Sequence, residues 1–319
     1  LEFSSVELFS YNSEEYNKYS YDSVSKMLYD FYSSREAFVL NRQKSSDLRR
    51  IVNTALERAS KKYDLQEKQL QDADKKDIYR VYGDLLNTYG YSLKGGESSF
   101  TTENFYDDNK EITIPLDKNK SAKENAKKYY DKYAKLSRTT KALSEEIVNT
   151  KNDIEHLLSI QTALDVSSDD ESLSQIRQEL VDFGYIKKHS SGKQKKSTSH
   201  PYHYISTDGY DIYVGKNNYQ NEELTFKVAT GNDWWFHAKG IPGSHVILKS
   251  NNEEDLPDRV YEEAAALAAF YSKAKDSEKV EVDYIQKKNI KKVAGAAPGF
   301  IYHSNWSMVA TPKADLQQK

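Results

Sequence analysis

Cysteine is absent from the 319-residue sequence, and so is any long hydrophobic run. Without cysteine the chain has no disulfide framework, no thiolate nucleophile and no cysteine-ligated zinc site. No apolar segment approaches the roughly 20 residues of a membrane span, and no secretory segment opens the chain. We therefore expect no membrane insertion, whereas the lack of cysteine leaves the compartment open.

The sequence also lacks an initiating methionine, because it begins Leu-Glu-Phe, and we expect it to be a piece of a longer protein. Its first 20 residues include FSSVELFSY, which alternates like a strand but has no obvious partner nearby. Because a lone strand is not stable, we expect this segment to belong to a sheet of the longer protein.

The chain has no large excess of charge of either sign. Its formal net charge of −3 argues against a protein that grips nucleic acid by bulk charge, so a basic face would have to be local. Hydrophobic residues make up 37% and charged residues 30% of the chain. This balance is too polar for one compact globule of this size and favours elongated, solvent-exposed helix.

Glycine and proline are scarce in the first part of the chain. Neither occurs in residues 1–82, and Pro115 is the only one between residues 97 and 183. Nine of the 13 glycines and five of the six prolines follow residue 183. Since helix interiors exclude both residue types, the sequence predicts long helices first and then a compact domain with strands and turns.

The helical part has the period of a coiled coil, in which the residues of the seam recur at alternating spacings of four and three. The second arm shows this seam at Tyr129, Tyr133, Leu136, Thr140, Leu143, Ile147, Thr150, Ile154, Leu157 and Gln161. The seam of the first arm is weaker and runs through Phe38, Asn41, Ser45, Leu48, Val52, Ala55 and Ala59. Two such arms joined by a connector predict an antiparallel hairpin.

The connector between the arms carries a small β element, which we place at about residues 95–118. Short strands are expected at 103–106 and 111–115, on either side of a turn cluster at Asp107-Asp108-Asn109. The tip of the hairpin is therefore predicted to be a β structure.

The chain after the second arm divides into a linker and a last domain. Residues 169–183 predict one short helix, and residues 187–196 then contain five lysines and no acid. This stretch is a solvated linker or a flexible phosphate-binding arm, and both hold if the arm stays disordered until RNA arrives. From residue 200, short alternating segments predict a meander of strands, followed by a helix at 255–275 and a strand at 279–285.

These patterns together predict an α+β protein. It consists of a long antiparallel coiled-coil hairpin with a small β element at its tip, followed by a compact C-terminal α+β domain. The expected divisions are a strand from a missing sheet of the longer protein at 1–20, the coiled-coil arm at 21–168, the short helix and lysine-rich linker at 169–199, and the C-terminal domain at 200–319.

The stretch NDWWFHAKGIPGSHVIL, residues 232–248, contains several side chains of types that bind ligands or take part in catalysis. A metal or hydrolase site there would use Asp233, His237, Ser244 and His245. The gap of seven residues between His237 and His245 does not match a helical histidine pair, and no carboxylate triplet stands beside the two histidines. A serine triad is recognised by geometry that a sequence does not show, so catalysis is the least favoured interpretation.

Two other interpretations of this stretch concern its alternating faces. Trp234 and Phe236 alternate with Trp235 and His237, so one face can enter a core. If the other face stays exposed, it offers an aromatic ring and imidazoles to unstacked RNA, where bases stack and phosphates find cations. A structural role for at least one tryptophan and a binding role for the opposite face are both kept.

We therefore expect no enzymatic activity, no cofactor and no metal, and RNA binding remains one of the interpretations. The candidate RNA-binding residues combine the linker lysines, the exposed strand face with its neighbours, and the lysines that precede the GAAPG loop. They are Lys193, Lys195, Lys196, Lys216, Asn217, Asn218, Trp235, His237, Lys239, His245, Lys291 and Lys292.

Three segments carry a resemblance to a known family. YDIYVGKNNYQNEELTFKVATGNDWWFHAKGIPGSHVIL resembles the RNA-binding module that closes proteins of the NFACT family. ITIPLDKNKSAKENAKKYYDKY and GAAPGFIYHSNWSMVATP are similar to that family as well, in the same order, so the resemblance extends from about residue 20 to residue 312. It implies the second half of such a protein: the end of the N-terminal domain, a coiled-coil arm and the RNA-binding module.

The resemblance implies a cytoplasmic factor that acts on the large ribosomal subunit and its rRNA. Such factors recognise subunits obstructed by peptidyl-tRNA, recruit alanyl-tRNA and direct alanine tails onto stalled nascent chains. The family's tRNA-selecting residues belong to its N-terminal domain, so this chain alone is not expected to support tailing. Streptococcal members also carry an adhesin label, which implies a rival function at the cell surface in binding host fibronectin or fibrinogen, without a visible signal peptide.

Overall fold

The computed structural model describes residues 20–167, 169–187, 199–253, 255–292, 297–299, 301–302 and 306–319. The strand expected before residue 20 therefore lies outside the described residues. The chain forms two compact units, one made of Glu57–Ile154 and the other of Leu1–Leu56 with Glu155–Lys319. Among the described helices, none is both long and apolar enough to cross a bilayer.

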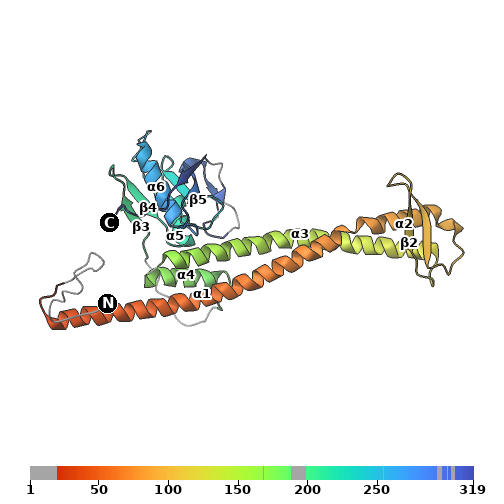
Figure 1. Cartoon of the computed structure of the whole chain (residues 1–319), viewed down its shortest axis with the longest axis horizontal. Coiled ribbons are helices and arrows are strands. Elements are labelled where there is room, and N and C mark those ends of the chain that lie inside the picture. Colours follow the sequence, from red (N-terminus) through yellow and green to blue (C-terminus); the bar gives the residue numbers. More distant parts are fainter. Residues whose placement is uncertain are drawn as a thin grey trace. The chain divides into compact units, whose positions relative to one another are not determined.

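Two long helices, α1 (Val24–Asp74) and α3 (Ala122–Val166), form a helical hairpin (Figure 1). The predicted seam is confirmed, because seam positions such as Val52, Leu143 and Leu157 are buried while most residues between them are exposed. Ion pairs such as Lys62 with Glu146, at 2.9 Å, flank the seam. The narrow apolar stripe is the main support of these helices, since charged residues cover their other faces.

The unit of residues 57–154 ends in the predicted β element, which the structure confirms. It comprises α2 (Asp77–Tyr89), a short 3-10 helix (Gly90–Ser92), β1 (Ser99–Asn104) and β2 (Lys110–Pro115). The first strand starts four residues earlier than expected. The turn lies where the sequence predicts it, because Asp108 and Asn109 adopt φ of 47° and 56°, a left-handed conformation that Asp and Asn tolerate. The antiparallel pair packs on α2 around Leu85 and Ile114, which are fully buried.

The predicted short helix after the hairpin is confirmed as α4 (Asp170–Asp182). After it comes a seven-stranded antiparallel sheet with the order β10-β7-β5-β6-β4-β3-β11. Its strands are β3 (Tyr202–Ile205), β4 (Asp211–Val214), β5 (Trp234–Ala238), β6 (Val246–Leu248), β7 (Val280–Gln286), β10 (Trp306–Ala310) and β11 (Gln317–Gln318).

The sheet departs from a simple meander in one respect. Residues 218–228, which were expected to alternate as strand, form helix α5 (Asn218–Glu223) and a π-helical turn η3 (Leu224–Val228). The Asn217 side chain caps α5 by accepting a hydrogen bond from the backbone N–H of Gln220 at 3.0 Å. Because this helical insertion separates β4 from β5, β4 pairs with β6 instead.

The two faces of the sheet have separate cores. Helix α6 (Asp258–Phe270) covers one face with a buried apolar stripe of Val260, Ala264, Leu267 and Ala268, and Tyr271, the residue after its end, is buried as well. The other face is covered by η3 and by the 3-10 turn η4 (Lys287–Asn289), around a smaller core of Leu224, Trp235, Ile247 and Ile290. A short pair, β8 (Lys291–Lys292) with β9 (Ile301–Tyr302), follows η4.

Candidate nucleic-acid interface in the C-terminal module

Strand β5 lies between β6 and β7 and sends a tryptophan into each core of the module formed by residues 200–319. Trp234 packs edge-on against Tyr261 of α6, with ring centroids 5.0 Å apart. Trp235 is 1% exposed inside the smaller core. The structural interpretation therefore holds for both indoles. The expectation that Trp235 offers an exposed ring is wrong, because η3 and η4 cover that face.

A row of polar side chains crosses the sheet on the same face as Trp235. His237 pairs in register with Asp283 of β7, and Asp283 pairs with Ser307 of β10, which donates a hydrogen bond to its carboxylate at 2.7 Å. The His237 ring also lies 5.5 Å from that of His245. His245 is buried, and its Nδ1 shares a hydrogen bond of 2.8 Å with the Thr225 hydroxyl. Of the two histidines, only His237 is partly exposed.

Asp233 does not join these histidines, which removes the geometry that a hydrolase site at residues 233–245 would need. Its buried carboxylate accepts hydrogen bonds from the backbone N–H groups of Thr230 and Ser250, at 2.7 and 3.0 Å, and pairs with Lys249. Burial alone would raise the pKa of Asp233, but Lys249 and the two N–H groups hold that pKa below its usual value. Among the residues that the structure describes, no cluster of three or more His, Asp or Glu side chains could hold a metal ion.

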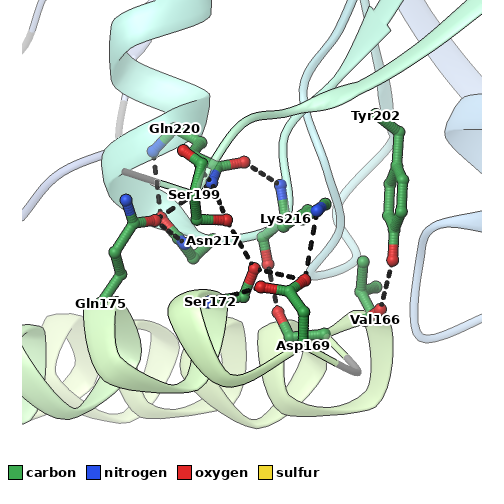
Figure 2. A network of polar contacts seen from close by, with 10 residues as sticks. Val166, Asp169, Ser172, Gln175, Ser199, Tyr202, Lys216, Asn217 and Gln220 are labelled. Carbon is green, nitrogen blue, oxygen red and sulfur yellow. Dashed lines mark hydrogen bonds and ion pairs between the residues drawn. The ribbon is translucent and has the colours of Figure 1, made fainter. Parts of the chain in front are cut away.

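Lys216 takes part in contacts between the sheet and α4 (Figure 2). Its ammonium pairs with Asp169 at 3.1 Å and lies 4.5 Å from the centre of the Tyr202 ring. Asp169 also caps α4, since it accepts a hydrogen bond from the Ser172 N–H at 2.7 Å. Burial opposes its ionisation, but the Ser172 and Lys216 contacts lower the pKa of Asp169. The Lys216 side chain therefore holds two elements together and is only slightly exposed.

Asn217 and Asn218 are also used inside the protein. Asn217 donates to Gln175 of α4 at 2.7 Å, a contact within the network of Figure 2. Asn218 donates to Glu179 of α4 at 2.8 Å, and the same carboxylate contacts His156 of α3 at 2.8 Å. Both asparagines are less than 5% exposed. Their expected exposure beside the tryptophan strand is therefore wrong, because they join the sheet to the helices.

Apart from Lys216, the predicted lysines fall into three groups. Lys291 and Lys292 are exposed on β8, and Lys292 pairs with Glu222 at 2.7 Å. Lys239 is exposed at the end of β5 and pairs with Glu281 at 3.5 Å. The linker lysines Lys193, Lys195 and Lys196 lie outside the described residues.

Sequence reasoning missed three features of this module. Asp283 stands opposite His237, but only the strand register reveals it, because 46 residues separate the two along the chain. Trp306 is 64% exposed on edge strand β10, and the motif SNWSM gave no sign of its exposure. Phe226 lies beneath the ammonium of Lys287, at 5.6 Å, because η3 folds back over the sheet.

Comparison with known proteins identifies the module. The family model for the NFACT N-terminal and middle domains matches residues 1–199, and that for the NFACT protein RNA binding domain matches residues 200–300. The chain belongs to the NFACT family. The sheet with α6 is thus the part of an NFACT protein that the family description assigns to RNA binding.

Relatives cover most of this chain. It is 39% identical to the Rqc2 homolog RqcH of Streptococcus suis over 95% of its length, and 38% identical to the RqcH of Bacillus subtilis over 92%. The chain spans about half the length of these relatives, 54% and 52%. A solved structure, the C-terminal part of the fibronectin/fibrinogen-binding protein of Streptococcus suis, is 36% identical with a TM-score of 0.67. The match covers 86% of this chain and 96% of that one. The predicted fold class and family are both confirmed.

Proposed function

We propose that this NFACT chain belongs to a ribosome quality-control factor and holds RNA of large ribosomal subunits obstructed by peptidyl-tRNA. The relatives named RqcH and the matched RNA-binding domain support this role. In the complete protein, the module contributes to recruiting alanyl-tRNA and to adding alanine tails to stalled nascent chains. The protein acts in the cytoplasm, where ribosomes are.

The observation that carries the proposal is local charge on a chain whose net charge is −3. Lys287, Lys288 and Lys291 lie in one short segment of the RNA-binding module. Among the described residues, no carboxylate lies within 4.0 Å of any of these three ammonium groups. Unpaired lysines can neutralise phosphates and release counterions, which supplies most of the affinity in nucleic-acid binding.

Sedimentation with purified subunits tests the proposal. The chain is mixed with large subunits that carry peptidyl-tRNA or with vacant subunits, and pelleted through sucrose at several salt concentrations. We expect pelleting with the obstructed subunits that weakens steeply with salt. Equal pelleting with vacant subunits would remove the preference for obstruction, and no pelleting at low salt would remove the ribosomal role.

The structural relative is a fibronectin/fibrinogen-binding protein, and this favours a second candidate, the binding of host fibronectin or fibrinogen. Immobilised fibronectin should then capture the chain at physiological salt with a saturable isotherm. A signal that rises without saturation would show adsorption and dismiss this candidate.

A further inference from the structure

The two covered faces of the sheet differ in charge. Helix α6 carries three acids on its accessible side, and its single arginine, Arg259, is already paired with Asp208 at 2.6 Å. These acids are Asp258, Glu262 and Glu263. A polyanion would meet repulsion along this helix, so α6 is a poor surface for RNA.

On the opposite face, two segments that are distant in sequence lie side by side. The backbone N–H of Lys287 donates to the Asp233 carbonyl at 2.8 Å, and the N–H of Lys288 donates to the Gly231 carbonyl at 3.0 Å. Further along, Lys292 reaches Glu222 at 2.7 Å. Residues 222–233 and 286–292 therefore form one continuous surface over the smaller core.

This surface keeps a net positive charge. Lys287, Lys288 and Lys291 have no carboxylate within 4.0 Å in the described part of the chain. Lys227 has only a long contact of 3.7 Å with Glu223, and both side chains are more than half exposed, so solvent screens that pair. Four ammonium groups thus remain available to phosphates.

Apolar groups lie among these lysines. Phe226 packs on the smaller core and is partly exposed, with the Lys287 ammonium 5.6 Å from its ring centre. Val228 is 40% exposed at the end of η3. The segment that presents them is a π-helical turn, a rare conformation that recurs at functional sites. A base with an open face fits such a surface, whereas a regular duplex would present only its backbone.

We propose that Phe226, Lys227, Lys287, Lys288 and Lys291, which we call the η3–η4 patch, bind unpaired RNA. The lysines contact successive phosphates, and one base stacks against Phe226, so the α6 side of the module faces away from the RNA. This assignment rests on the proposed function, because it names the surface and the form of RNA that the module takes.

Fluorescence anisotropy of the full chain with a single-stranded RNA 15-mer, and with a blunt RNA duplex of that length, tests the patch. The altered protein carries Lys287→Gln, Lys288→Gln and Lys291→Gln. The matched control carries Lys273→Gln, Lys275→Gln and Lys313→Gln, which are exposed lysines after α6 or beside it. Both variants remove the same charge, and thermal melting checks that both fold.

We expect the patch variant to bind the single strand about tenfold more weakly at 0.1 M salt. The slope of log affinity against log salt should fall by about 2, because each lost phosphate contact on a single strand contributes about 0.7. Phe226→Leu keeps an apolar side chain in the core, and it should weaken binding at least about fivefold with the slope unchanged, because stacking is lost. The control variant should lose less than about twofold.

Other results overturn the patch. Equal losses in the patch and control variants would show that affinity follows net charge alone. Tighter binding of the duplex than of the single strand, or no effect of Phe226→Leu, would exclude the stacked base. If the unaltered chain binds neither RNA nor subunits, the proposed function itself fails; if it binds both and the patch variant is unaffected, only this surface is wrong.

Discussion

Asp233→Asn is the substitution whose effect the structure defines best. The Asp233 side chain is 2% exposed, and each of its carboxylate oxygens accepts one backbone N–H, from Thr230 and from Ser250. An asparagine has one oxygen and one NH2 group, so it must place a donor against one of these N–H groups. It also loses the charge that pairs with Lys249.

The cost can be worked from these contacts. A hydrogen bond to a charged group contributes about 1.5–3 kcal/mol, and a buried donor left without an acceptor costs about 1–3 kcal/mol. We therefore expect Asp233→Asn to lower the free energy of unfolding of the module by about 3 kcal/mol. Lys249→Met should cost less, about 1–2 kcal/mol, because the lysine is 22% exposed and the carboxylate keeps its two N–H donors. The exposed Asp276→Asn serves as the control, with a change below about 0.5 kcal/mol.

The effect should depend on pH with a definite sign. The pKa of Asp233 is lowered in the folded state, so the unfolded state binds the proton more tightly. The stability that this carboxylate contributes is complete above its unfolded pKa of about 4 and is lost as the pH falls through the folded value. The difference between the unaltered chain and Asp233→Asn should be constant between about pH 6 and pH 8 and shrink below about pH 4.

Urea unfolding followed by tryptophan fluorescence isolates this module. All three tryptophans of the chain, Trp234, Trp235 and Trp306, lie in it, so the signal does not report the tip of the hairpin. A loss below about 1 kcal/mol at pH 7, or a difference between the two proteins that grows as the pH falls, would refute the assigned role of the carboxylate.

Substitutions at three further positions test other parts of the fold. Gly83→Ala would bring a Cβ within 2.8 Å of the Tyr130 ring and displace that ring. It should therefore lower the midpoint of thermal unfolding of the tip, measured by far-ultraviolet circular dichroism. An unchanged midpoint would contradict the close packing. Asn218→Leu removes a hydrogen-bond donor to the buried Glu179. The rate of amide hydrogen exchange in α4 should then rise at least about tenfold. Unchanged protection would show that this contact does not hold α4 in place. Ser121→Ala breaks the reciprocal cap that Ser121 and Glu124 form at the start of α3, so it should lower the free energy of unfolding by about 1 kcal/mol. Ser121→Asp should restore most of that free energy, because aspartate also caps helices.

Much of the fold follows from local pattern. The seam through Val52 and Leu143 and the apolar stripe through Ala264 depend on residues a turn apart, so spacing alone reveals them. The strand pairing does not. Residues 218–228 contain alternating apolar positions, which are typical of a strand. The Asn217 cap and the contacts with α4 make them helical instead, so tertiary contacts override the local pattern.

The candidate site was less predictable for the same reason. Trp235 and His245 have the residue types of a binding surface, but both are buried. The elements that cover this face of the sheet are η3, which comes directly after the unexpected helix α5, and η4. Lys216 has a charge suited to phosphate, but Asp169, 47 residues earlier, pairs with it. Lys291 is exposed as expected, because a lysine in a short run without acids rarely finds a buried partner. Exposure of charged runs is therefore readable from sequence, whereas long-range partners are not.

Ultraviolet cross-linking of the chain to large subunits obstructed by peptidyl-tRNA, with mass spectrometry of the cross-linked peptides, tests the central claim most directly. The account predicts RNA adducts on residues 222–233 and 286–292, and none on α6. Adducts concentrated on α6, or confined to the helical hairpin with the module unlabelled, would contradict it.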